Sequence, residues 1–187
     1  MQNGRTPLMV ASIEGYVDIV KMLVEARTNS INKQNEDGFS ALHLAAQHGR
    51  ADVVRVITEA LAHVDIKTKD RQTALFIASE KGHRSVVELL LLHHADVDIC
   101  SEEGWTALHL AAQGGNVEVL RLLMEAEANT NVCTEDGNTA LDLAIWRGDG
   151  TSVRLLTENF ADVNIKYMDG WDCTSTWQHS TERRVDV

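Results

Sequence analysis

The chain has 187 residues, of which 44% are hydrophobic and only 5% aromatic, so a packed, mainly aliphatic core is expected. Its 17 Lys and Arg residues against 28 Asp and Glu residues give a net charge of −11, which argues against nucleic acid or an anionic membrane as the main partner. No basic-then-apolar leader precedes Gly4, and the longest apolar run, 89–92, is too short to span a bilayer. We therefore expect an intracellular protein, cytoplasmic or nuclear, without direct membrane insertion.

One segment recurs with a period of 33 residues. Residues 38–46 read GFSALHLAA and residues 104–112 read GWTALHLAA, and related segments begin at residues 4, 71 and 137. The leucine in the fifth position of each copy recurs at spacings of 34, 33, 33 and 33 residues. These leucines are Leu8, Leu42, Leu75, Leu108 and Leu141. Five copies in one phase predict an array of small supersecondary units.

Each copy predicts two short helices. A hydroxyl residue suited to an N-cap stands before a proline or an alanine, so a first helix begins there. These caps are Thr6, Ser40, Thr73, Thr106 and Thr139. A glycine about nine residues on is placed to end the helix, and an amphipathic second helix follows. Because helices this short are marginal alone, neighbouring copies must stack into an elongated solenoid.

This pattern resembles the ankyrin repeat, whose signature G-x-T-P-L-H-L-A-A-x-x-G-H-x-x-V-V-x-L-L-L-x-x-G-A-D-V-N is matched over roughly residues 3–171. The resemblance implies an all-α solenoid of helix-turn-helix units with β-turn or loop fingers. Arg71 departs from the pattern by replacing the turn glycine, and Met9, Phe76 and Asp142 replace the histidine. The repeats are expected at 1–34, 35–67, 68–100, 101–133 and 134–166, followed by a partial sixth turn and a degenerate or disordered tail at 167–187.

Residues that could carry catalysis fall on positions that the repeat explains. His43 and His109 share one helix position, where the resemblance implies that the ring ties the turn to the helix. No hydrolase elbow, zinc-protease motif, phosphate-binding loop or dinucleotide fingerprint is present. The three cysteines are an odd number without C-x-x-C spacing, which favours reduced thiols over a zinc site. We therefore expect a non-enzyme without cofactor or metal.

The candidate binding residues are those that the repeat does not dictate. The resemblance places a concave binding face along the turn tips and the exposed ends of the inner helices. Aromatic residues follow the turn at Phe39, Trp105 and Trp171, and Trp146 and Arg147 form an exposed pair at a helix end. Because Trp and Arg are enriched in interface hot spots, these residues are predicted to bind a partner. The alternative is that the rings pack on neighbouring turns.

Acidic residues precede the turn glycines and form a row that is broken in the third copy. They are Glu36, Asp37, Glu102, Glu103, Glu135 and Asp136. Acidic tips with aromatic residues behind them predict a basic peptide or a Lys/Arg-rich protein surface as the partner. The alternative is that these carboxylates are ordinary solvated turn residues.

One possible modification comes from the resemblance alone. Many ankyrin arrays are hydroxylated on an asparagine whose motif has a leucine six residues before Asp-Val-Asn. Leu156, Asp162, Val163 and Asn164 match that spacing, which makes Asn164 the candidate.

The expected function is that of a non-catalytic protein-protein interaction module, as in a scaffold or an adaptor, and the chain is expected to be a monomer. Two alternatives stay open. The chain could be the substrate-recruiting arm of a larger enzyme such as a ubiquitin ligase or a kinase, or it could be a structural spacer.

Overall fold

The computed structural model describes residues 4–26, 31–60 and 62–158, which form ten α-helices and no β-strand. In chain order the helices are α1 (Pro7–Glu14), α2 (Val17–Glu25), α3 (Ala41–Gln47), α4 (Ala51–Glu59), α5 (Ala74–Lys81), α6 (Arg84–Leu92), α7 (Ala107–Gly114), α8 (Val117–Glu125), α9 (Ala140–Arg147) and α10 (Gly150–Glu158). The predicted all-α fold class is confirmed. We call the odd-numbered helices inner and the even-numbered helices outer.

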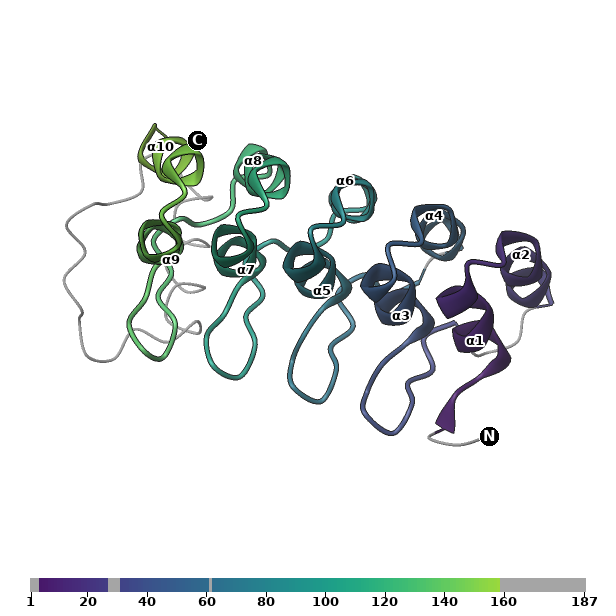
Figure 1. Cartoon of the computed structure of the whole chain (residues 1–187). Helices are drawn as coiled ribbons and strands as arrows, with labels where there is room; N and C mark the ends of the chain where they lie inside the picture. Colours follow the sequence, from purple (N-terminus) through teal and green to yellow (C-terminus); the bar gives the residue numbers. More distant parts are fainter. Residues whose placement is uncertain (1–3, 27–30, 61, 159–187) are drawn as a thin grey trace, which may run out of the picture. The chain divides into compact units, whose positions relative to one another are not determined.

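The chain divides into two compact units, Met1–Asp96 and Val97–Val187. Within the first unit, α3 packs between α1 and α5, and α4 packs between α2 and α6 (Figure 1). Within the second unit, α7 packs on α9 and α8 on α10. Each unit is thus a stack of helix pairs in two layers, which lets short amphipathic helices bury their apolar faces.

The inner helices begin and end where local side-chain chemistry predicts. Each N-cap hydroxyl accepts a hydrogen bond from the backbone N–H three residues on, as Thr73 Oγ1 does from Phe76 N at 3.2 Å. Four inner helices end at a glycine in the left-handed conformation. These glycines are Gly15, Gly82, Gly115 and Gly148. The predicted N-caps are therefore confirmed, and so are the glycine ends of α1, α5, α7 and α9, whereas the C-cap of α3 is His48, one residue before Gly49.

The core between the layers is aliphatic, as the composition predicts. Small alanines such as Ala45, Ala78 and Ala111 are fully buried on the inner helices. The outer helices bury β-branched and leucine side chains, with Val54 and Leu90 at 0% exposure. Asp52 and Glu118 lie in the first turns of α4 and α8, where a negative charge favours the positive end of the helix.

The loop before each of α3, α5, α7 and α9 forms a finger of five residues. Fingers 2, 3, 4 and 5 are residues 35–39, 68–72, 101–105 and 134–138. In each finger, the N–H of the first residue donates to the carbonyl of the fifth at 2.9 Å. The fourth residue has a positive φ in all four fingers, and it is arginine only in finger 3, where Arg71 has φ +60°. The fingers project from the inner layer of each unit (Figure 1).

Candidate functional site

The tips of fingers 4 and 5 are acidic in the second unit. Glu102, Glu103, Glu135 and Asp136 are exposed, and none of these carboxylates forms an ion pair with another described residue. The backbone N–H of Glu135 donates to the carbonyl of Glu103 at 3.0 Å, so the two tips are held beside each other. The second unit therefore presents four uncompensated carboxylates on a hydrogen-bonded frame.

The first unit has finger tips of mixed charge. Glu36 and Asp37 are exposed on finger 2, whereas Lys69, Asp70 and Arg71 are exposed on finger 3. The N–H of Lys69 donates to the carbonyl of Asp37 at 3.3 Å, which joins these two fingers as well. An acidic tip and a predominantly basic tip thus lie side by side.

Phe39 and Trp105 are half-buried against imidazole rings of their own repeats. The Phe39 ring meets His43 edge-on at a centroid distance of 5.9 Å, and Trp105 meets His109 at 6.0 Å. The rings are therefore partly covered and do not project freely into solvent. Edge-to-face packing on a buried imidazole gives both side chains a structural role.

His109 ties its own helix start to the next finger. Its Nδ1 accepts from the Thr106 N–H at 3.1 Å, so the ring hydrogen is on Nε2, which donates to the carbonyls of Val132 and Asn138 at 3.0 and 3.2 Å. Burial lowers the pKa of His109 to about 4, against the opposing effect of these carbonyls. The ring is neutral at pH 7, as a structural tie requires.

His43 makes the same connection in the first unit. Its Nδ1 accepts from the Ser40 N–H at 3.0 Å, and its Nε2 donates to the Gln72 carbonyl at 3.2 Å. Burial lowers the pKa of His43 to about 4. The structural use predicted for both histidines is confirmed, and neither has the accessibility that a catalytic base needs.

Trp146 and Arg147 lie at the end of α9 and differ in how they are held. The Trp146 side chain is 68% exposed. The Arg147 guanidinium donates through Nη1 to the Gln113 carbonyl at 2.9 Å, at the carboxyl end of α7. Of the two predicted residues, Trp146 offers apolar surface to a partner, whereas Arg147 is already engaged.

Arg147 belongs to a recurrent contact that sequence reasoning missed. Arg50 Nε donates to the Ile13 carbonyl at 2.9 Å, and His83 Nε2 donates to the Gln47 carbonyl at 3.2 Å. In each case a nitrogen-bearing side chain of one repeat satisfies a carbonyl at the end of the preceding inner helix, which is the end that favours positive charge. The sequence does hint at this contact, because each of these three side chains is next to the glycine that follows an inner helix.

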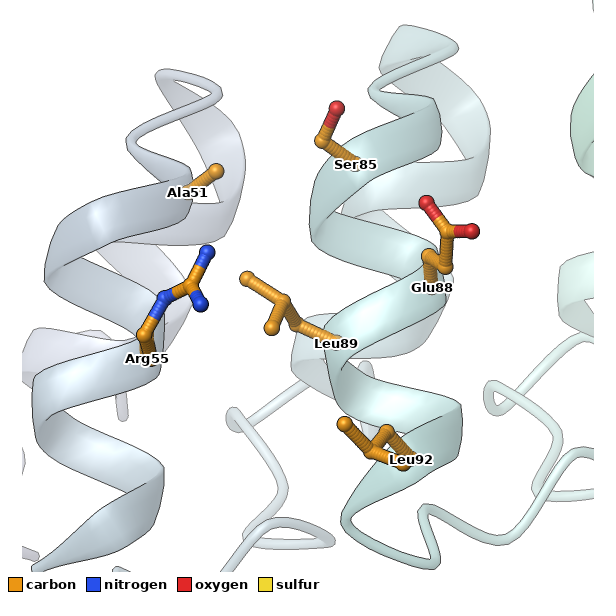
Figure 2. A pocket seen from close by; sticks show the side chains of 6 residues that line it. All are labelled: Ala51, Arg55, Ser85, Glu88, Leu89 and Leu92. Atoms are coloured by element: carbon orange, nitrogen blue, oxygen red, sulfur yellow. The ribbon is translucent and has the colours of Figure 1, made fainter.

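A hollow of about 600 Å³ lies between outer helices α4 and α6 of the first unit (Figure 2). Its lining residues are Ala51, Arg55, Ser85, Glu88, Leu89 and Leu92. Figure 2 shows Arg55 on α4 pointing toward α6, from which Leu89 points back. None of the residues predicted from the sequence lines this hollow.

The remaining predictions concern metals, membranes and thiols. Over the described ranges, no group of three or more His, Cys, Asp or Glu side chains could hold a metal ion, and no helix has the length and apolarity to cross a bilayer. Cys133 is a free thiol, as expected for this position, and Cys173 is outside the described residues. Trp171 and Asn164 lie outside the described residues, whereas Leu156 is buried in α10.

The family model described as ankyrin repeats (3 copies) matches residues 1–70, 27–99 and 75–167. The chain therefore belongs to the ankyrin-repeat family, which generally provides non-catalytic modules that bind other proteins.

Curated relatives include the following three. Alpha-latrocrustotoxin-Lt1a of Latrodectus tredecimguttatus is 39% identical over 64 residues, which are 34% of this chain and 4% of the toxin. Ankyrin repeat and SAM domain-containing protein 6 of Mus musculus is 36% identical over 68 residues, or 36% of this chain and 8% of that protein. Protein phosphatase 1 regulatory subunit 12A of Mus musculus is 32% identical over 68 residues, or 36% of this chain and 6% of that protein. The chain matches less than a tenth of the length of each.

Proposed function

We propose that the chain binds a basic peptide or a Lys/Arg-rich protein segment and catalyses no reaction on it. The observation that carries this proposal is the pair of acidic tips on fingers 4 and 5. Their four carboxylates are exposed, lack ion pairs with the described residues and are held together by the Glu135–Glu103 backbone bond. Glu36 and Asp37 give the first unit a separate acidic tip of the same kind.

The acidic residues and the aromatic residues of the proposed site affect binding in different ways. Exposed charges separated from a partner by solvent add little affinity, but they raise the rate of encounter with an oppositely charged partner. Trp146 supplies apolar surface, and a tryptophan covered by a partner slows dissociation. Phe39, Trp105, Trp171 and Arg147 complete the proposed set. Phe39 and Trp105 are half-buried beside His43 and His109, so each contributes the part of its side chain that stays exposed.

The ligand must reach from the finger tips to Trp146. α9 has eight residues and Trp146 is the seventh, so roughly 10 Å of helix separates it from the start of α9 at a rise of about 1.5 Å per residue, and the length of finger 5 adds to this distance. An extended peptide therefore needs more than about three residues to reach from the tip to Trp146. A segment with Lys or Arg at one end and an apolar or aromatic residue a few positions away fits this geometry.

The proposal can be tested with a fluorescently labelled 12-residue peptide that contains four lysines and one leucine, compared with a glutamate version of the same peptide. The double variant Glu103→Gln, Asp136→Asn is expected to slow association with the lysine peptide and to reduce its salt dependence. Trp146→Ala is expected to speed dissociation about tenfold or more, with little change in stability, because the ring is exposed. Stopped-flow measurements at low and physiological salt separate the two rates.

A matched control removes two carboxylates from the outer helices instead. Glu125 on α8 and Glu158 on α10 are exposed, so Glu125→Gln with Glu158→Gln changes the net charge by the same amount. This control should associate nearly as fast as the unmodified protein. An equal loss in the control would assign the effect to overall charge and not to the fingers. Equal binding of the lysine and glutamate peptides would contradict the proposed specificity and favour a spacer role.

A further inference from the structure

The hollow between α4 and α6 contains a leucine at a position where the other repeats have a charge. Leu92, at the end of α6, is 71% exposed and is the most exposed large apolar residue of the described ranges. The other four outer helices have glutamate at this repeat position, namely Glu25, Glu59, Glu125 and Glu158. The third repeat therefore places an apolar side chain on a surface that is otherwise charged, which is a feature of interaction surfaces.

A second residue of the same helix face also departs from the repeat. Glu88 in α6 replaces a basic residue that all the other outer helices have, namely Lys21, Arg55, Arg121 and Arg154. Ser85, Glu88, Leu89 and Leu92 are three, four and seven residues apart, so they share one face of α6. Both replacements thus fall on the face that lines the hollow.

The replacement at Glu88 gives the hollow opposite charges from its two helices. Arg55 on α4 and Glu88 on α6 are exposed, and neither forms an ion pair with another described residue. Leu89 lies between these two side chains in Figure 2. An apolar centre with one positive and one negative side chain beside it is complementary to itself, because a two-fold axis sets each charge opposite the other charge of a second copy.

We infer that this hollow is the contact surface of a symmetric dimer, in which a second copy of the chain places its own α4 and α6 against the same two helices. Arg55 of each copy then faces Glu88 of the other, and the symmetry forms this pair twice. Leu89 and Leu92 of both copies are removed from water between the two pairs. This dimer differs from the monomer expected from the sequence.

The dimer contact is separate from the proposed peptide site. α4 and α6 belong to the outer layer of the first unit, whereas the fingers project from the inner layer (Figure 1). Finger tips therefore stay accessible in the dimer, and the inference does not depend on peptide binding there.

The dimer is expected to be weak. Six residues line the hollow, which is fewer than the roughly 20 to 30 residues per side of a standard interface, and the net charge of −11 opposes association. Sedimentation velocity of the full chain in about 0.15 M salt, from about 10 μM to 1 mM, covers the range expected for so small an interface. The sedimentation coefficient should rise with concentration toward that of a dimer.

A substitution at Leu92 tests the apolar part of the contact. Leu92→Glu gives α6 the residue that the other outer helices have, so it should leave the fold intact, as circular dichroism can show, and weaken the dimer at least about tenfold. Met22→Glu is the matched control, because Met22 is 62% exposed on α2 and lies outside the hollow. It adds the same charge and should leave the dimer unchanged. Equal losses in the two variants would assign the effect to net charge and overturn the inference.

An exchange of charges tests the predicted ion pair. Arg55→Glu and Glu88→Arg should each weaken the dimer about tenfold, because each sets like charges opposite one another at both symmetry-related contacts. Glu88→Arg also makes the net charge less negative, so overall repulsion predicts the opposite result. A mixture of the two variants should associate again, since both contacts of the mixed dimer join opposite charges. The inference is overturned if the unmodified chain is still a monomer at about 1 mM, or if the mixture associates no better than either variant alone.

Discussion

Successive repeats are connected by two kinds of polar side chain that lie in different surroundings. In the inner layer, His43 and His109 are 0% and 1% exposed, and each ring bonds its own repeat and the next. In the loops that follow the outer helices, a half-buried Asp65 accepts from the Asp96 N–H at 3.1 Å. The first connection is sealed from water, whereas the second is partly hydrated.

The comparison shows how burial selects the residue. Burial opposes the charged form of both groups, so it lowers the pKa of His43 and His109 and raises the pKa of Asp65. An imidazole is neutral at pH 7 and still bonds through both nitrogens, so it suits the sealed position. Asp65 occupies a position that also suits a neutral amide, as Asn32 shows by accepting from the His63 N–H at 2.9 Å.

The largest expected effect is a loss of stability in mild acid. The folded state holds fewer protons on His43 and His109 than the unfolded chain, because their pKa falls from 6.5 to about 4 on folding. Their contribution is therefore complete above pH 6.5 and is lost as the pH falls to about 4. Each histidine accounts for about 3 kcal/mol, and denaturant unfolding followed by circular dichroism between pH 7 and 4 measures the loss.

A smaller effect is expected from replacing one buried imidazole. His109→Phe copies the residue that the third repeat has at this position, Phe76, but leaves the Thr106 N–H and the Val132 and Asn138 carbonyls without the ring as a partner. We expect a loss of about 3 kcal/mol in the free energy of unfolding at pH 7. Equilibrium denaturation in urea measures it.

Two comparisons make this result specific. His63 is exposed, so His63→Phe should change stability by less than about 0.5 kcal/mol. At pH 4 the difference in the free energy of unfolding between the unmodified protein and His109→Phe should be smaller than at pH 7, because the variant has no imidazole to protonate at this position. If this difference in the free energy of unfolding were the same at pH 7 and pH 4, it would contradict the conclusion that the His109 ring is neutral and hydrogen-bonded through both nitrogens.

The fold could be predicted because its determinants are local and repeated. The hydroxyl before each inner helix and the glycine after it act within one turn of backbone, so Thr106 and Gly115 can be assigned from the sequence alone. Helix stacking followed from the shortness of the helices.

The site was predicted less completely because it depends on contacts between repeats. Trp105 and Trp146 are the same residue type, but their surroundings differ because they lie at opposite ends of the inner helices. Trp105 contacts the His109 ring, whereas Trp146 is exposed. The hydrogen bond from Arg147 to the Gln113 carbonyl joins residues that are 34 apart in the sequence, so it forms only when two repeats stack in space.

The smallest expected effect is a gain in stability from Asp65→Asn at neutral pH. The folded state binds a proton at Asp65 more readily than the unfolded chain, because burial raises its pKa. The contribution of Asp65 is therefore present below its unfolded pKa of 3.8 and is lost as the pH rises through the folded pKa. An asparagine keeps the oxygen that accepts from Asp96 N–H without the buried charge.

Asp65→Asn should thus raise the urea midpoint at pH 7 but not at pH 3, whereas Asp65→Ala should lower it at pH 7 by removing the acceptor. If Asp65→Asn lowered the midpoint at pH 7, the charge itself would be stabilising and the contrast with the histidines would fail.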